Sequence, residues 1–164
     1  MSDYVLAQLN IAELLAPIDS PQLADFVDNL ERINALAEQS SGFVWRLQTD
    51  DGDATALRPF GENCIVNMSV WQDIESLHHY VFHTAHIEIM RRRKEWFSRL
   101  KDASKVMWWI PAQDTPTVTE AKARLDHLRA HGATATAFTF KRPFPPPGSP
   151  DRASTPLDDA CPAF

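Results

Sequence analysis

The sequence predicts an α+β fold: a ferredoxin-like β-α-β-β-α-β antiparallel sheet, followed by a C-terminal helix and a short strand. Short segments alternate apolar and polar residues, longer segments repeat apolar residues at helical spacing, and the two kinds follow each other in that order. At 164 residues the chain is long enough for one hydrophobic core. We therefore expect a single domain over residues 1–142.

The first strand and the first helix are predicted from residues 4–39. Alternation over residues 4–11 puts apolar side chains on one face of a strand and a more polar set on the other: Tyr4, Leu6, Gln8 and Asn10. Ser20 is a typical helix N-cap, and Pro21 is a typical first helical residue. Apolar residues then recur at helical spacing as far as about Gln39.

Two strands and a long helical stretch are predicted next. The strands cover residues 43–47 and 64–71, with an acidic, turn-rich loop between them. Asp73 can cap the helical stretch that follows the second strand. Thr84 can cap a second helical segment if the helix breaks near His83.

The last predicted elements are a strand, a helix and a short strand. Residues 106–110 form the strand, which Pro111 ends, and residues 117–131 show helical spacing. Residues 134–140 are expected to add the short strand. Residues 143–164 are rich in proline and cannot bury much surface, so we expect a flexible tail.

Composition and charge restrict the class of protein. The formal net charge of −6 argues against general nucleic-acid binding, which requires basic surface. No apolar stretch approaches the roughly 20 residues of a membrane span, and the N-terminus lacks a secretory signal pattern. Cys64 and Cys161 form neither a disulfide framework nor a CxxC motif. We therefore expect a cytoplasmic protein with no membrane or nucleic-acid partner.

The strand at residues 64–71 has one apolar face and one polar and aromatic face. If the latter coincides with the polar face of the first strand, the interior presents Tyr4, Gln8, Asn10, Asn67, Ser69 and Trp71. Val66, Met68 and Val70 are then expected to pack under helices. The polar set suits a small-molecule pocket among aromatic walls, and it equally suits a hydrated interface between subunits.

Several side chains of the helical stretch lie within roughly 60° of one another, near its buried side: His79, His83, His86 and Met90. A buried imidazole can be a hydrogen-bonded structural group, a metal or haem ligand, or a group that moves a proton. A two-histidine, one-carboxylate metal site lacks its acid here, because Glu88 and Glu95 point the opposite way. The other interpretations stay open.

Further candidates lie on the neighbouring elements. Arg46 and Arg93 can each hold an anionic substrate group, and each can equally form a surface ion pair. Trp108 and Trp109 point to opposite sides of their strand, so one packs under helices while the other can line a cavity. Cys64 lacks an activating neighbour, and the chain contains no GxSxG elbow and no phosphate-binding glycine loop.

Specific motifs carry a family resemblance. Asn10, Val70-Trp71 and Thr84-Ala85-His86 resemble the dimeric α/β-barrel superfamily, which includes antibiotic-biosynthesis-type and haem-degrading monooxygenases. The stretches GFVWRLQ, NMSVW, RRRKEWF and WWIPA look more like an uncharacterised bacterial family within it. The resemblance covers about residues 4–140 and implies a dimeric α/β barrel. Haem-degrading members use an asparagine and an axial histidine that Asn10 and His86 match, whereas their helical tryptophan has only Tyr80 as its nearest counterpart.

The bare face of such a sheet gives a separate reason to expect a homodimer. Helices cover one face of a ferredoxin-like sheet, and an uncovered apolar face is commonly buried by a second subunit. The expected partners are therefore a second copy of the chain and a small-molecule ligand.

Two classes of function follow. The first is a monooxygenase-like enzyme that acts on an aromatic or lipophilic substrate inside the cavity. In it His83 or His86 is base or ligand, and Asn10 and Asn67 polarise a carbonyl or dioxygen species. Its expected substrate contacts are Tyr4, Gln8, Ser69, Trp71, Arg93, Trp108 and Trp109. A haem-binding or haem-degrading protein with His86 as ligand is an alternative, and no other cofactor is indicated. The second class is a non-catalytic ligand-binding dimer.

Overall fold

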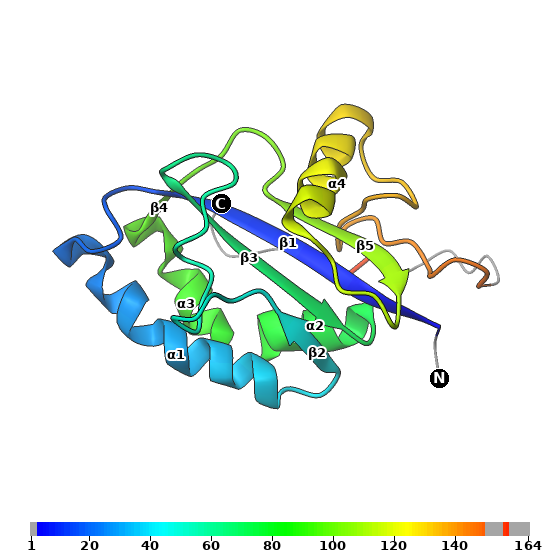
Figure 1. The fold of residues 1–164 in the computed structure, drawn as a ribbon, viewed down its shortest axis with the longest axis horizontal. Helices are drawn as coiled ribbons and strands as arrows, with labels where there is room; N and C mark the ends of the chain where they lie inside the picture. Colours follow the sequence, from blue (N-terminus) through cyan, green and yellow to red (C-terminus); the bar gives the residue numbers. More distant parts are fainter. Residues whose placement is uncertain (1–2, 150–155, 158–164) are drawn as a thin grey trace.

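The computed structural model describes residues 3–149 and 156–157. A curled antiparallel sheet carries α1, α2 and α3 on one face and α4 on the other, as Figure 1 shows. The predicted α+β class is confirmed. The strands are β1 (Tyr4–Leu14), β2 (Phe43–Arg46), β3 (Cys64–Trp71), β4 (Phe97–Ser98) and β5 (Lys105–Pro111). The α-helices are α1 (Ala24–Gln39), α2 (Ile74–His83), α3 (His86–Arg91) and α4 (Val118–His131).

Strand β1 is the centre of the sheet. It pairs with β3 on one side and with β5 on the other, and β2 adds to the far edge of β3. The short β4 pairs only with the end of β1, at Glu13 and Leu14. Alternation along β1 explains this position, because its apolar face and its mixed face are each buried against a separate layer.

The apolar face of the sheet is covered within the chain. Val5, Ala7 and Leu9 on β1 lie in one buried cluster with the corresponding residues of β3 and β5, and α4 packs over them through Ala121, Leu125 and Leu128. The loop between β2 and β3 covers the same face through Ala54. The bare apolar face that suggested a second subunit is therefore already filled by this chain's own segments, and the homodimer stays a prediction.

Several predicted element ends are confirmed by their hydrogen bonds. Asp73 Oδ1 accepts from the Ser76 backbone N–H at 2.8 Å, and so caps α2. Thr117 Oγ1 caps α4 by accepting from the Glu120 N–H at 3.1 Å. The predicted N-cap at Ser20 is wrong, because its side chain makes no capping bond and Pro21 opens a 3-10 turn (Pro21–Leu23) that leads into α1.

The helical stretch breaks near His83, the possibility that the sequence left open. α2 ends at His83, and Thr84 has extended backbone angles of φ −123° and ψ −179°. α3 then starts at His86, and a 3-10 turn (Arg93–Glu95) follows it. The stretch is thus two short helices, and residues on either side of Thr84 do not share one helical face.

The predicted strand over residues 134–140 is wrong. This segment forms only isolated bridges, of which Met107 with Phe138 ties it to β5. Phe138 and Phe140 are nevertheless buried beside α2, because the segment folds over the end of the sheet as a loop. Most of the proline-rich stretch 143–164, together with Cys161, lies outside the described residues.

Among the residues that the structure describes, no helix has both the length and the apolar character that crossing a membrane requires.

Gly42 lies in the turn between α1 and β2, and replacing it tests whether this turn tolerates a side chain. Its φ is +84°, and a Cβ built on it would overlap Ser76 Oγ. Gly42→Ala should therefore lower the free energy of unfolding in urea by roughly 1–3 kcal/mol. Gly52→Ala is the matched control, because its φ of +86° is nearly the same while nothing lies within 4 Å of its Cβ. Equal losses in the two variants would contradict the steric argument.

Candidate functional site

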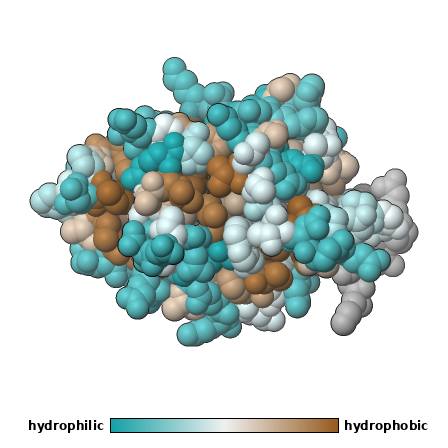
Figure 2. Space-filling view, in the orientation of Figure 1, coloured by the Kyte–Doolittle hydropathy of each residue, from teal (hydrophilic) through white to brown (hydrophobic). Residues whose placement is uncertain are grey.

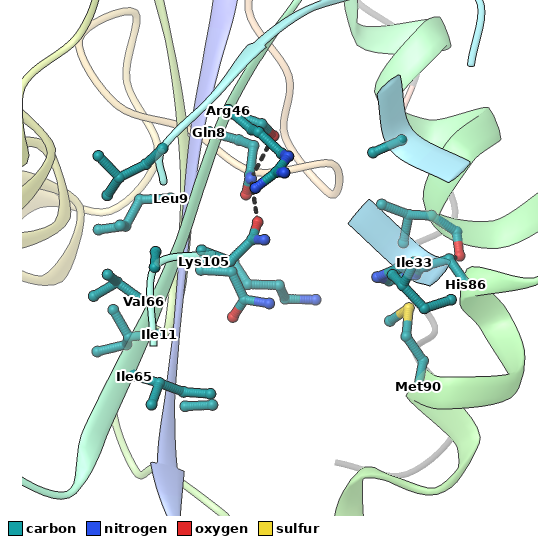
Figure 3. A pocket seen from close by; sticks show the side chains of 18 of the residues that line it. Gln8, Leu9, Ile11, Ile33, Arg46, Ile65, Val66, His86, Met90 and Lys105 are labelled. Atoms are coloured by element: carbon teal, nitrogen blue, oxygen red, sulfur yellow. Dashed lines mark hydrogen bonds between the residues drawn. The ribbon is translucent and has the colours of Figure 1, made fainter. Parts of the chain in front are cut away.

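A cavity of about 230 Å³ lies between the mixed face of the sheet and the helices α1, α2 and α3. Figure 3 shows its two walls. Gln8, Arg46 and Lys105 extend from the strands toward the open space, and His86 and Met90 face them from the helical side. Figure 2 shows hydrophobic side chains gathered between α1 and the strands, with hydrophilic surface around them.

Strand register places three polar residues side by side on the sheet wall. Asn67 on β3, Asn10 on β1 and Lys105 on β5 are direct cross-strand neighbours. Asn10 and Asn67 are exposed although they lie on the two inner strands of the sheet. Exposure at the middle of a sheet requires that the covering layer stand away from it, so the cavity opens to solvent over this row.

A chain of hydrogen bonds fixes the next row inward. Gln8 Nε2 donates to Ser69 Oγ and to Asn67 Oδ1, each at 2.7 Å. Trp71 Nε1 donates to the same Ser69 oxygen at 2.9 Å. Gln8 and Ser69 are buried, and these bonds satisfy polar groups that water does not reach. Because Gln8 holds the Asn67 oxygen, the Asn67 amide nitrogen remains as a donor toward the cavity.

Three aromatic rings connect the sheet to the helical wall. Trp71 is fully buried, and its ring stacks on that of Tyr80 at a centroid distance of 5.0 Å. The Tyr80 ring contacts His86 at 4.8 Å. Tyr80 OH donates to the Ile33 carbonyl of α1 at 3.2 Å, and burial raises the pKa of the Tyr80 phenol. Tyr80 is therefore a neutral hydrogen-bond donor that supports the His86 ring.

His86 is held as a neutral imidazole. Its Nδ1 lies 3.2 Å from the Val81 carbonyl oxygen, which can only accept, so Nδ1 carries the proton. Burial lowers the pKa of His86 to about 4, and the hydrogen bond to Val81 opposes this shift only in part. Near neutral pH the unprotonated nitrogen is therefore Nε2.

The charged residues of the cavity wall are mostly basic: Arg46, Arg93 and Lys105, against Asp53. Asp53 accepts from the Thr55 backbone N–H and hydroxyl, at 2.9 and 2.6 Å. Arg46 bonds the Glu38 carboxylate at 2.7 Å and the Gly52 carbonyl at 2.7 Å. Arg93 is buried. The lining therefore carries more basic than acidic side chains.

The cavity gathers a subset of the predicted site residues: Gln8, Asn10, Asn67, Ser69, His86 and Arg93. Gln8, Asn10, Asn67 and Ser69 come from the adjoining polar faces of β1 and β3, and His86 and Arg93 come from α3 and the turn after it. Helices α1–α3 cover the sheet face on which these polar residues lie. The opposite, apolar face is covered by α4. Trp71 lies directly behind the wall, through its bond to Ser69.

The other predicted residues lie away from the cavity lining. His83 is exposed and its ring stacks with that of exposed His79, because α2 ends before the chain turns inward. Trp108 lies on the α4 side and donates to Glu120. Trp109 is on the mixed face, but it is bonded to the Phe144 carbonyl beyond the end of the cavity. Tyr4, at the start of β1, pairs with Pro111.

Several lining residues were not predicted, among them Lys105, Asp53 and Thr55. Lys105 lies next to Asn10 because of the β1–β5 register, which cannot be read from the sequence. Asp53 and Thr55 come from the loop between β2 and β3, whose path over the sheet leaves no periodic signal. Alternation alone places Lys105 on the same face of β5 as Met107. Only the β1–β5 register brings Lys105 beside Asn10.

Neither metal coordination nor thiol chemistry gains support. Across the described part of the chain, no group of three or more His, Cys, Asp or Glu side chains is placed to hold a metal ion. Burial raises the pKa of the Cys64 thiol, which disfavours the nucleophilic thiolate.

Comparison with protein families adds one assignment. A family model described as "Domain of unknown function (DUF3291)" matches residues 5–154. The chain belongs to this family. No curated protein matches the sequence.

The solved structures to which this DUF3291 protein is similar share little sequence with it. SnoaB of Streptomyces nogalater, described as a cofactor-independent oxygenase, is 16% identical in its N63A mutant form, with a TM-score of 0.43 over 70% of this chain and 97% of that one. NE2512 of Nitrosomonas europaea, of unknown function, is 15% identical with a TM-score of 0.44 over 70% and 95%. PA3566 of Pseudomonas aeruginosa is 12% identical with a TM-score of 0.47 over 70% and 98%.

The low pKa of His86 predicts a pH-dependent stability. The unfolded chain binds this proton near pH 6.5 and the folded chain only near pH 4, so the free energy of unfolding falls as the pH drops between these values. The loss is on the order of 3 kcal/mol at 1.36 kcal/mol per pKa unit. Urea unfolding at several pH values should show a flatter profile for His86→Gln. His83→Gln, at an exposed site, should keep the wild-type slope; an unchanged slope in His86→Gln would contradict this prediction.

Replacing Ser69 tests whether the hydrogen bonds among Gln8, Ser69 and Trp71 stabilise the fold. Ser69→Ala leaves Trp71 Nε1 and one Gln8 N–H without an acceptor in a buried position. We expect a loss of about 1–3 kcal/mol in the free energy of unfolding, measured by urea titration. Ser41→Ala, on the exposed turn before β2, is the control and should change stability by less than about 0.5 kcal/mol. A Ser69→Ala protein as stable as this control would show that the chain of bonds is dispensable.

Proposed function

We propose that this DUF3291 protein is a small-molecule enzyme that removes a proton from an electron-rich hydroxyaromatic or enolic substrate, which dioxygen then oxidises. The observation that carries the proposal is the state of His86. Its Nδ1–H is bound to the Val81 carbonyl, so Nε2 is left as a base at a cavity wall. A base that is neutral near pH 7 is ready to accept a proton without first losing one.

The opposite wall suits the anion that this proton transfer creates. Asn67 offers an amide N–H toward the cavity, and Lys105 lies on the same sheet wall. Arg93, in the turn after α3, also lines the cavity. Fixed donors and positive charges stabilise an oxyanion more than the neutral molecule that precedes it. We infer that the substrate's acidic oxygen lies between His86 and the sheet, where a base and oxyanion donors face each other.

Size and lining limit the substrate. The cavity of about 230 Å³ is slightly below the common range of roughly 300–1,000 Å³ for ligand pockets. Ile33, Val81, Ile89 and Met90 supply an apolar helical wall. These features favour a compact, mainly apolar molecule of one or two rings with a polar edge.

The proposed oxidation balances without a resident cofactor. Deprotonation of a phenol-type oxygen gives an electron-rich anion, which transfers electrons to dioxygen. One oxygen atom enters the ring and the other leaves as water, so that a naphthol and one dioxygen give a naphthoquinone and one water. The chain's own residues bind the substrate, move its first proton through His86 and hold the anion. Dioxygen is the oxidant.

The haem alternative is a weaker fit to the described residues. His86 Nε2 is a suitable axial donor. The cavity volume, however, is below that of typical cofactor pockets, and Tyr80, at the position nearest the expected helical tryptophan, is packed between Trp71 and His86. We expect the Soret spectrum of hemin to be unchanged by added protein. A shifted band that disappears in His86→Ala would instead support haem binding.

An oxygen electrode tests the enzymatic proposal with 1-naphthol as the probe. Wild-type protein should consume dioxygen and form 1,4-naphthoquinone in equal amounts, without added cofactor. His86→Ala should lower the rate by roughly 10²–10⁴-fold, the usual contribution of a general base. His83→Ala, three positions earlier on the exposed end of α2, should retain the wild-type rate.

The alternative of a non-catalytic ligand-binding protein has its own result. Saturable binding of 1-naphthol by tryptophan fluorescence, with no dioxygen consumption, would favour binding alone. Equal consumption by wild-type protein and His86→Ala would reject His86 as the base.

A further inference from the structure

We propose that Thr84 is a positioning residue, which interrupts the helical stretch so that His86 bonds the Val81 carbonyl and presents Nε2 to the cavity. Its relevance to turnover rests on the proposed function. The structural claim itself, that Thr84 determines which nitrogen of His86 carries the proton, can be measured without a substrate.

The argument starts from the carbonyls at the end of α2. In a continuous helix the Tyr80 and Val81 carbonyls would accept from the backbone N–H groups of Thr84 and Ala85. Here α2 ends at His83, and such terminal carbonyls need other donors. Two side chains supply them: Thr84 Oγ1 donates to the Tyr80 carbonyl at 2.6 Å, and His86 Nδ1 bonds the Val81 carbonyl at 3.2 Å.

The Thr84 hydroxyl serves both helices. Its hydrogen is used at the end of α2, in the bond to the Tyr80 carbonyl. Its oxygen accepts from the His86 backbone N–H, at the start of α3, at 3.3 Å. One hydroxyl therefore ties the residue that supports the His86 ring to the backbone of His86 itself. The extended backbone of Thr84, a β-branched residue, is compatible with this turn.

The break decides on which side of the helical layer His86 lies. Without it, His86 would follow His83 by three helical positions, within roughly 60° of the same face. That face is exposed, and it carries the stacked rings of His79 and His83. Because the chain turns at Thr84, His86 instead contacts Tyr80 and lines the cavity.

The proton position follows from the same turn. The Val81 carbonyl cannot donate, so the nitrogen that bonds it must carry hydrogen. The tautomer of a neutral histidine is determined by the partner of one nitrogen, which leaves the other as the acceptor. By exposing the Val81 carbonyl to a side-chain donor, Thr84 makes Nε2 the basic nitrogen.

The experiment is long-range ¹H–¹⁵N NMR of the histidine rings on the full chain near pH 7, with His86 assigned by comparison with His86→Gln. Wild-type protein should show the Nδ1–H tautomer at His86. Thr84→Val keeps the branched shape but removes the hydroxyl, and should lower the ratio of Nδ1–H to Nε2–H by roughly two- to tenfold, as expected for one lost hydrogen bond. Thr84→Ser should restore the wild-type signal. Thr136→Val, on an exposed turn, is the matched control and should leave His86 unchanged.

Several results would overturn the proposal. An Nε2–H tautomer in wild-type protein would do so even if Thr84→Val failed to fold. A wild-type tautomer ratio in a folded Thr84→Val protein would do so as well, as would failure of Thr84→Ser to restore it.

The two proposals fail separately. If the tautomer depends on Thr84 while His86→Ala consumes dioxygen at the wild-type rate, the positioning role stands and the proposed function falls. If His86→Ala is inactive but Thr84→Val keeps both tautomer and rate, the function stands and the role of Thr84 falls.

Discussion

The hydrogen bonds of Gln8 are the constraint on which the cavity depends. An amide in the middle of a central strand costs about 1–3 kcal/mol if it is buried without partners. Ser69, directly opposite Gln8 on β3, and Asn67, two residues farther along the same face, remove that cost by accepting from its amide. The polar wall is stable only as a set, and it leaves Asn10 and Asn67 in contact with solvent. Helices cannot close tightly over such a surface, so a cavity persists where an apolar face would have collapsed.

The two faces of β1 pack against different layers and have different roles in the fold. Apolar residues on one face pack against α4 and the loop between β2 and β3, and this layer supplies most of the buried hydrocarbon. The other face is apolar at one end, through Leu6 and Trp71, and polar toward the cavity. α2 packs on the apolar end through Leu77 and Tyr80. The site is thus supported by a core on both sides, which fixes its side chains more firmly than a loop-borne site would be.

Local signals in the sequence were sufficient for several element ends, although Ser20 does not cap α1 and the two-residue β4 was not predicted. Asp73 and Thr117 cap their helices as side-chain acceptors, and β3 has the expected bounds because Cys64–Trp71 alternates without interruption. Long-range arrangement was not accessible in this way. Alternation separates two faces of a strand, but it does not tell which helical layer covers each, so α4 was not expected on the apolar face. His83 was misplaced because a helical wheel assumes a continuous helix. Lys105 and Asp53 reach the cavity through register and loop path, which carry no periodic pattern.

The chemistry of His86 depends on features at three scales. The break at Thr84 turns the ring inward, the end of α2 provides a carbonyl that binds Nδ1, and the surrounding apolar layer removes the water that would stabilise the imidazolium. A histidine needed only for packing would gain nothing from a neutral ring whose second nitrogen borders a cavity. The opposite wall, formed by the sheet, carries the Asn67 amide and the positive charge of Lys105. An unprotonated base facing groups that stabilise negative charge is the arrangement that proton abstraction requires, because the proton and the charge it leaves behind are then received on different walls.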